Sequence, residues 1–185
     1  MKTVSLFSGA GGLDIGAIKA GAKIIWANDI MKDACATYKQ NIGDHIVHGD
    51  LNEHLEELSE IQGVDLVIGG PPCQGFSVAG KMNPEDPRSQ MIWAYQKVIS
   101  IVNPRAFIME NVKALGALSK WEGIRNQLLD GFRKLGYSTS YIVLNATDFD
   151  VPQTRERVFI VGFKGDINTT PNLHEMMQPY MKKAK

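Results

Sequence analysis

A cysteine lies in an unusual setting in the stretch GGPPCQGFS, which spans residues 69–77. Cys73 follows two prolines and comes shortly after the apolar run VDLVIGG at 64–70. The glycines let another molecule approach the backbone closely, and the prolines stiffen the chain ahead of the thiol. A structural cysteine more often lies inside a strand or a helix, where the segment DACATY places Cys35. The setting of Cys73 therefore predicts a nucleophile.

Other ionisable residues also stand at the ends of apolar runs. Glu110 follows the apolar residues of RAFIME, which suits an acid directed at a ligand, although a surface carboxylate at a strand terminus would give the same pattern. Arg155 and Arg157 lie two residues apart at the entrance to the run RVFIVGF. For either arginine, an ordinary ion pair is the alternative to a catalytic role, with these candidate partners: Asp148, Asp150 or Glu156.

A glycine-rich turn follows the first apolar run. The segment LFSGAGGLDIG at 6–16 passes from a strand through Gly9, Gly11 and Gly12 into a helix. Asp14 stands where the dinucleotide motif GxGxxG requires its third glycine, so this turn alone could simply close a tight corner. The chain has no GxxxxGK[ST] loop, which argues against a nucleotidase of the P-loop type.

Two aspartates end the next two apolar runs. Asp29 lies about 20 residues after Gly9, the interval at which an acidic residue of such folds binds ribose hydroxyls. Asp50 ends the third run and precedes Leu51, so a helix N-cap is nearly as well supported there as a ligand contact. Together with the glycine turn, these carboxylates suit an adenosine compound that lacks a pyrophosphate.

These residues depend on an alternation of short apolar runs with segments of helical periodicity. Runs rich in β-branched and aromatic residues predict buried strands at 3–7, 23–28, 44–49, 64–70, 105–110, 140–145 and 157–163. Apolar residues recur at helical spacing over 51–61, 92–102 and 124–135. This order predicts an α/β fold, with a mainly parallel sheet, helices on both faces and ligands at the carboxyl ends of the strands.

Length and composition limit the class of protein. The chain has 185 residues, 44% of them hydrophobic and 22% charged, which suits one globular domain with a full core. The net charge of zero argues against a strong sequence-wide basic field, while a local basic patch stays compatible with it. No apolar run reaches the length of a membrane span and the N-terminus lacks a signal peptide, so we expect an intracellular, cytoplasmic protein without a membrane partner. Two cysteines without CxxC spacing predict neither a disulfide framework nor a metal site.

Four motifs occur in a fixed order along the chain, namely FSGAGG, PPCQGFS, ENV at 110–112 and QTRERVF at 153–159. They resemble the motifs of the DNA cytosine-5 methyltransferases, and the resemblance covers the chain up to about residue 165. It implies a Rossmann-like fold dependent on S-adenosylmethionine, with a catalytic and cofactor-binding domain at 1–165. The tail at 166–185 is expected to form a short helix after a cap-like Thr170 and Pro171. Packing on its own domain is the simpler interpretation of its apolar face, and a docking surface for another chain or domain is the alternative.

The resemblance implies that a cytosine flipped out of DNA is methylated at carbon 5 through a covalent adduct. In it, Cys73 is the nucleophile and Glu110 contacts ring nitrogen 3. Arg155 reaches the base carbonyl, and Arg157 orients either the cysteine loop or Glu110. The polar segment 74–90 is expected to form a lid over the extruded nucleotide.

The same resemblance implies a set of cofactor contacts. Asp29 is expected at the ribose, Ile30 and Asp50 at adenine, and Pro72 at both the cofactor and the target base. The residues expected to bind S-adenosylmethionine are Phe7, Ser8, Gly9, Ala10, Gly11, Gly12, Asp29, Ile30, Asp50, Leu51 and Pro72.

Family members normally continue into a target-recognition domain and a last motif, and neither is expected within these 185 residues. The chain is therefore interpreted as a truncated catalytic part, as one chain of a two-chain enzyme whose partner supplies target recognition, or as a remnant. Two other functions stay open: methylation of tRNA, and a non-catalytic module that binds the cofactor.

Overall fold

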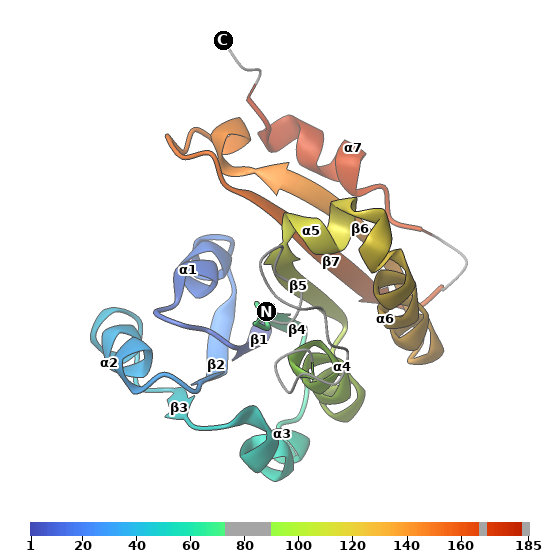
Figure 1. Ribbon diagram of the computed structural model, residues 1–185. Coiled ribbons are helices and arrows are strands. Elements are labelled where there is room, and N and C mark those ends of the chain that lie inside the picture. Colours follow the sequence, from blue (N-terminus) through green and yellow to red (C-terminus); the bar gives the residue numbers. More distant parts are fainter. Residues whose placement is uncertain (73–89, 167–169, 183–185) are drawn as a thin grey trace.

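The computed structural model describes residues 1–72, 90–166 and 170–182. Within these residues, seven strands form one sheet in the order β3-β2-β1-β4-β5-β7-β6 (Figure 1). Each predicted apolar run forms one strand. The strands are β1 (Lys2–Leu6), β2 (Lys23–Asp29), β3 (Ile46–His48), β4 (Leu66–Gly69), β5 (Ala106–Val112), β6 (Tyr137–Asn145) and β7 (Glu156–Lys164).

The direction of the strands decides which motifs meet. Strands β3, β2, β1, β4 and β5 pair in parallel, whereas β7 runs antiparallel to both β5 and β6. The predicted mainly parallel sheet is therefore confirmed, with β7 reversed. Because of this reversal, the start of β7 lies beside the end of β5, and Val112 is paired with Arg157. Two motifs that are far apart in the sequence thus become neighbours.

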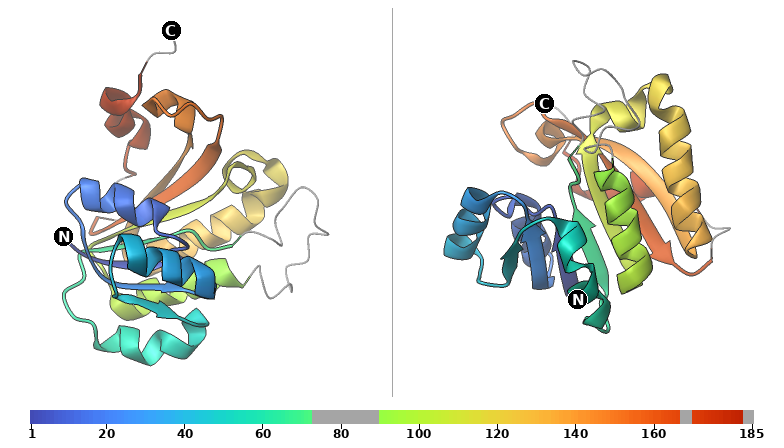
Figure 2. Two further views of the ribbon diagram at one scale, coloured as in Figure 1. Left: turned by 90° about the vertical axis from the view of Figure 1, so that its left-hand side faces the viewer. Right: turned by 60° about the horizontal axis from the view of Figure 1, so that its bottom comes forward.

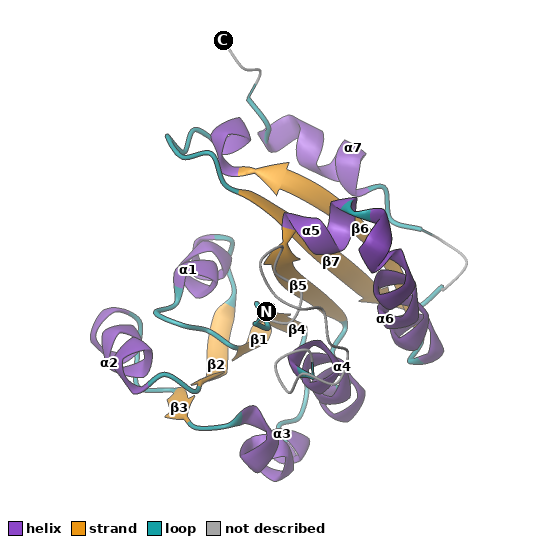
Figure 3. Ribbon diagram, in the orientation of Figure 1, coloured by secondary structure: helices purple, strands orange, loops and turns teal. Residues whose placement is uncertain are grey.

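Helices cover both faces of the sheet, as predicted (Figures 2 and 3). On one face, α1 (Gly12–Lys19) and α2 (Lys32–Asn41) cover the N-terminal half. On the other face lie α3 (Leu55–Glu60), α4 (Met91–Val102) and α6 (Glu122–Lys134). Shorter helical segments are η1 (Leu51–His54), α5 (Lys113–Ala117), η2 (Ser119–Trp121), η3 (Ala146–Phe149), α7 (Leu173–Met177) and η4 (Gln178–Tyr180).

The core follows the alternation of side chains along the strands. In β4, Leu66 and Ile68 pack under α1 and α2, while Val67 packs on the opposite face. Aromatic rings stabilise the larger cluster, where the centroids of Phe107 and Phe132 lie 4.2 Å apart. Each such fully buried side chain contributes about 1.5–3 kcal/mol. This rigid core holds the strand ends, at which the motifs lie, in fixed positions.

The predicted tail helix is present as α7, but its N-terminal cap differs from the expectation. Asn172 caps it, with its side-chain oxygen accepting a hydrogen bond from the backbone N–H of Glu175. Thr170 and Pro171 lie just before the cap. Leu173 is buried against the domain, which agrees with a helix packed on its own sheet, whereas Tyr180 is 70% exposed.

Helix length also bears on membrane crossing. The longest described helix, α6, has 13 residues, whereas a membrane span needs about 20. None of the helices in the described ranges has the length and apolar character required to cross a bilayer.

Candidate active site and cofactor pocket

A cavity of about 730 Å³ opens at the carboxyl ends of β1, β4 and β5, between α1 and α7. One side of it consists of the first strand end and the glycine turn, and another carries the charged groups of the later motifs. The sequence-predicted residues that line it are Phe7, Ser8, Gly12, Glu110, Arg155 and Arg157. Its apolar wall comes mainly from Ile142, Leu144, Phe149, Phe159, Leu173 and Met177.

Glu110 and Arg157 form an ion pair inside this cavity. Arg157 Nε lies 3.0 Å from Glu110 Oε1, and about a quarter of each side chain is exposed. Burial raises the pKa of Glu110 above its ordinary value, and the charges of Arg157 and then Arg155 partly offset that rise. Glu110 therefore holds its proton up to a higher pH than an exposed glutamate does.

The strand that carries Glu110 also holds the start of the cysteine loop. A Cβ atom on Gly70 would lie 3.2 Å from Glu110 Oε2, so the carboxyl group packs directly over that glycine. Asn111 is 2% exposed, and its Nδ2 donates a hydrogen bond to the carbonyl of Pro71 at 3.0 Å. Asn111 of the ENV motif thus holds the backbone in place at Pro71, two residues before Cys73. Cys73 and segment 74–89 of the predicted lid lie outside the described residues.

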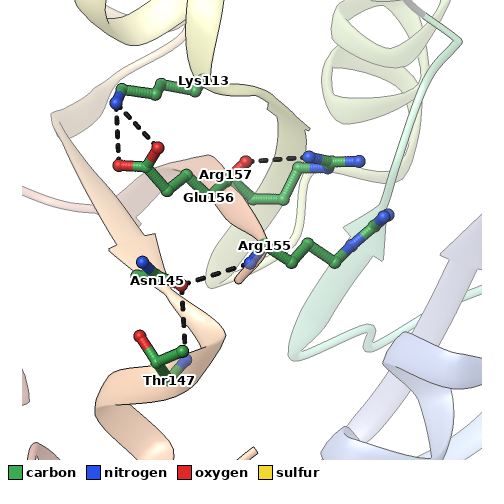
Figure 4. A network of polar contacts seen from close by, with 6 residues as sticks. All are labelled: Lys113, Asn145, Thr147, Arg155, Glu156 and Arg157. Atoms are coloured by element: carbon green, nitrogen blue, oxygen red, sulfur yellow. Dashed lines mark hydrogen bonds and ion pairs between the residues drawn. The ribbon is translucent and has the colours of Figure 1, made fainter. Parts of the chain in front are cut away.

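The two arginines share one face at the start of β7, because residues two apart in a strand point the same way. Figure 4 shows both guanidinium groups extending away from the pair formed by Lys113 and Glu156. Lys113 Nζ lies 2.8 Å from both carboxylate oxygens of Glu156. The ion pair with Glu156 that was an alternative for either arginine is therefore not formed. Arg155 makes no ion pair with any other described residue.

Asn145 anchors the backbone of the first arginine. Its Oδ1 accepts hydrogen bonds from the backbone N–H groups of Thr147, at 3.3 Å, and Arg155, at 3.2 Å (Figure 4). This side chain ties the turn after β6 to the entrance of β7. Lys182 pairs with Asp150 farther along the same turn, so Asp150 is not available to the arginines either.

The glycine turn has the strained backbone that its composition suggests. Gly9 and Gly11 have φ values of 56° and 91°, and Phe7 adopts 54° without being glycine. A Cβ atom on Gly11 would lie 2.1 Å from Ile42 Cδ1 and 2.9 Å from Tyr38 Cδ2, so these two side chains would have to shift to accept it, in addition to the strain of a φ of 91°. On Gly9 or Gly12 it would meet no atom within 4 Å. The turn is therefore closely packed at Gly11, against Ile42 and Tyr38, and open at Gly9 and Gly12.

Asp29 braces this turn. One carboxylate oxygen accepts a hydrogen bond from the N–H of Gly9 at 2.7 Å, and the other accepts from Met31 at 2.8 Å. With 9% of its surface exposed, Asp29 joins the glycine turn to the start of α2. A carboxylate has further lone pairs, so the expected contact with ribose stays a prediction.

Eight of the expected cofactor residues lie outside the lining of the cavity, namely Gly9, Ala10, Gly11, Asp29, Ile30, Asp50, Leu51 and Pro72. Asp50 caps η1 by accepting from the N–H of Asn52 at 2.8 Å, which confirms the helix-cap interpretation for that residue. Leu51 is 3% exposed and packs in the core, while Ile30 is 63% exposed. Pro72 is exposed at the edge of the described segment. Their contacts with a cofactor stay predictions.

The sequence profile of the family described as C-5 cytosine-specific DNA methylase matches residues 1–185. The chain belongs to this family. It is 41% identical over 169 residues to the type II methyltransferase M.FnuDI of Fusobacterium nucleatum, covering 91% of this chain and 48% of that protein. It is 41% identical over 185 residues to M.MthTI of Methanothermobacter thermautotrophicus, and the match covers 100% of this chain and 54% of that protein. The methylase chain thus spans about half the length of these two relatives.

Solved structures show the same fold. A prophage-encoded DNA modification methyltransferase of Escherichia coli matches 99% of this methylase and 51% of its own chain, with a TM-score of 0.79 and 29% identity. The Dnmt2 methyltransferase of Schizosaccharomyces pombe matches 100% of this methylase and 56% of its own chain, with a TM-score of 0.76 and 24% identity. The expected Rossmann-like methyltransferase fold is confirmed.

Membership of the methylase family implies S-adenosylmethionine as the methyl donor, and the residues present fit such a ligand. Gly12 of the glycine turn lines the cavity, and a Cβ atom on Gly9 or Gly12 would meet no described protein atom within 4 Å. A strained turn at a strand end that faces open space is the form that close backbone contact with a ligand requires. The described residues contain no cluster of three or more potential metal ligands of the His, Cys, Asp or Glu type.

Sequence reasoning missed several residues that organise this methylase site. Asn111 follows Glu110 directly, and a polar residue inside an apolar strand is a usable signal for it. Asn145 gave the weaker signal of an asparagine at the end of a predicted strand. Buried Ser5 gave no signal, because a serine within an apolar run is compatible with either face of a sheet.

Proposed function

We propose that this methylase chain transfers a methyl group from S-adenosylmethionine to carbon 5 of cytosine in DNA through a covalent adduct on Cys73. The position of Glu110 carries this proposal. Its carboxyl group, with a raised pKa, packs over Gly70 only three residues before Cys73 and lines the same cavity as the glycine turn. An acid, the strand end that leads to Cys73 and the glycine turn therefore border one cavity.

The residue types suit the chemistry of the ring. Carbon 5 of cytosine is a poor nucleophile until a thiolate adds to carbon 6, so the Cys73 sulfur forms a bond to carbon 6. Glu110 donates its proton to ring nitrogen 3 as this bond forms, which leaves an enamine with a nucleophilic carbon 5. Bound S-adenosylmethionine supplies a methyl group activated by a positively charged sulfur. Once carbon 5 carries the methyl group, a base such as a water molecule takes its proton, and the C–H electron pair forms the double bond that expels the Cys73 sulfur as a thiolate. Ring nitrogen 3 returns its proton to Glu110.

The surrounding residues hold and tune these groups. Arg157 fixes the orientation of Glu110 through the ion pair at 3.0 Å. Arg155, which lines the cavity and has no ionic partner among the described residues, is free to contact the base carbonyl. The turn from Phe7 to Gly12 and the brace at Asp29 hold the cofactor. We keep the assignment of four more residues to the cofactor on the strength of the family resemblance, namely Ile30, Asp50, Leu51 and Pro72.

Target recognition is a separate proposal. We infer that the target sequence is read by residues outside the matched region, either in the same protein or on a second chain. The support is that this chain covers 48% and 54% of M.FnuDI and M.MthTI, but 71% of M.AquIA from Picosynechococcus, to which it is 40% identical. Members of the family thus differ in how much chain accompanies this part.

Trapping with DNA that contains 5-fluorocytosine tests the function. Fluorine replaces the proton that must leave carbon 5, so a reacting cysteine stays attached to the base. We expect an adduct on Cys73 in the presence of S-adenosylmethionine and any partner chain, lost in Cys73→Ser and kept in Cys35→Ala, because Cys35 is buried in α2. Absence of an adduct under all these conditions would leave only a cofactor-binding role. A fluorinated tRNA in parallel separates the two polymers.

A further inference from the structure

Beneath the glycine turn lies a chain of buried hydroxyl groups. Ser8 Oγ donates to Ser5 Oγ at 2.9 Å, and Ser5 Oγ donates to Asp14 Oδ1 at 2.6 Å. The residues are 9%, 1% and 0% exposed in that order, and all three line the cavity. Asp14 is the residue that replaces the third glycine of the dinucleotide motif. The mechanism proposed above uses neither Asp14 nor Ser5.

The carboxylate decides the direction in which these hydroxyls point. Ser5 Oγ donates its hydrogen to Asp14 Oδ1, and an ionised carboxylate offers no hydrogen in return. The oxygen of Ser5 then accepts the hydrogen of Ser8, and the oxygen of Ser8 is left with lone pairs but no hydrogen to offer. The distance of 2.6 Å between Ser5 and Asp14 is the length of a hydrogen bond to a charged oxygen. Ser8 is therefore an acceptor at the wall of the cavity.

The other side of Asp14 is held by α2. Its Oδ2 has no hydrogen-bond partner among the described residues, although the Tyr38 hydroxyl is close enough to lower the pKa of Asp14. Tyr38 Oη lies 3.1 Å from His45 Nε2, and its ring packs under Gly11. Burial is the larger influence and raises the pKa of Asp14. Burying a carboxylate costs free energy even beside hydroxyl groups, so packing alone does not explain an aspartate here.

We propose that Asp14 is a positioning residue, which orients Ser5 and Ser8 so that the Ser8 hydroxyl accepts a hydrogen bond from the ammonium group of the cofactor's amino-acid moiety. This inference rests on the proposed function, which places residues 7–12 around that moiety. The moiety carries one donor, the ammonium, and one acceptor, the carboxylate. An acceptor backed by a negative charge favours the ammonium.

The test compares two ligands on three variants of the full chain. The ligands are S-adenosylhomocysteine and its deamino analogue, in which hydrogen replaces the α-amino group. Asp14→Asn keeps the shape but supplies an N–H donor that lets the hydroxyls reverse, and Ser8→Ala removes the acceptor. Because the lost hydrogen bond joins the Ser8 hydroxyl to a charged group, we expect each of these two variants to bind S-adenosylhomocysteine about tenfold more weakly by calorimetric titration, which is about 1.4 kcal/mol.

The deamino analogue shows which group of the ligand is concerned. It is expected to bind the wild-type chain about tenfold more weakly than S-adenosylhomocysteine, with no further loss in Asp14→Asn or Ser8→Ala, because the lost bond is the same one. The thermal midpoint of unliganded Asp14→Asn should not fall, since a buried charge has been removed. Tyr137→Phe is the matched control. It removes a buried hydroxyl bonded to the carbonyl of Pro104, which does not line the cavity, and should leave both affinities within twofold.

Two outcomes overturn the inference alone, given a wild-type chain that binds S-adenosylhomocysteine. One is unchanged affinity in both variants, and the other is an equal loss for both ligands. A wild-type chain that binds neither ligand would instead overturn the proposed function and the ammonium contact with it. Amide hydrogen exchange of residues 8–12 in unliganded Ser5→Ala then still tests whether the buried hydroxyl chain holds the glycine turn. Faster exchange than in wild type supports this role of the chain, and unchanged exchange contradicts it.

Discussion

The two sides of the cavity differ in composition, because one consists mainly of charged side chains and the other mainly of backbone. The side expected to face the base consists of partly exposed charged side chains on β5 and β7, with the ion pair of Glu110 and Arg157 at its centre. The side expected to face the cofactor consists of backbone in left-handed conformations, braced from below by buried groups such as Asp29 and Asp14. We therefore expect the first side to respond to charge and pH, and the second to volume and backbone conformation.

The largest effect should come from Gly11→Ala on the cofactor side. The new Cβ atom would lie 2.1 Å from Ile42 Cδ1 and 2.9 Å from Tyr38 Cδ2, at a φ of 91°. Strain and overpacking together should lower the free energy of unfolding by about 3 kcal/mol, measured by denaturant titration.

Gly12→Ala is the control for this change, because its Cβ atom meets nothing within 4 Å. Its free energy of unfolding should stay within about 0.5 kcal/mol of wild type, as for an unstrained surface substitution. Equal losses in the two variants would mean that the space beneath the turn is not the constraint.

A smaller effect is expected on the base side from Asn111→Ala. The change removes the buried donor to the Pro71 carbonyl and the part-buried acceptor for the N–H of Val112, and should cost about 2 kcal/mol of unfolding free energy. Adduct formation on fluorinated DNA should fall strongly, because the cysteine loop loses its tether. Affinity for S-adenosylhomocysteine should hardly change.

Asn41→Ala serves as the control for that prediction, since Asn41 makes one exposed hydrogen bond, to the carbonyl of Thr37. It should alter neither the stability nor the adduct yield. If Asn111→Ala weakened cofactor binding as much as it weakened adduct formation, the two sides of the cavity would be coupled and the comparison above would be wrong.

The sequence predicts the strands and the charged residues at their ends better than it predicts how the strands pair. Strand positions follow from β-branched and aromatic runs, and the acid and arginines follow from motifs at the strand ends. The direction of β7 could not be predicted, because periodicity does not distinguish a parallel from an antiparallel strand. The pairing of Val112 with Arg157 therefore came only from the structure. Asp50 stayed ambiguous for another reason, since an aspartate before a helix suits both a cap and a ligand contact.

The buried hydroxyl chain was beyond sequence reasoning altogether. Ser5 lies within an apolar run, and its partner Asp14 lies nine residues later on a helix, so nothing in the local pattern joins them. The only sign was negative, namely that Asp14 replaces an expected glycine. A buried polar network depends on how a helix packs on a sheet, and that geometry is set by the whole core rather than by neighbouring residues.

The smallest expected effect concerns pH and the ion pair on the base side. Burial raises the pKa of Glu110 in the folded chain, so the folded state binds a proton that the unfolded state has already released. The resulting stabilisation of wild type is present below the unfolded pKa and is lost as pH rises through the folded one. Relative to Glu110→Gln, wild type should lose on the order of 1 kcal/mol or less across that window, because the arginines offset part of the shift. Denaturant titrations of both chains between pH 4 and pH 8 measure the difference. A difference that instead grew in favour of wild type with rising pH would mean that the ion pair with Arg157 outweighs burial, and the neutral acid would then have to be produced by the arriving base.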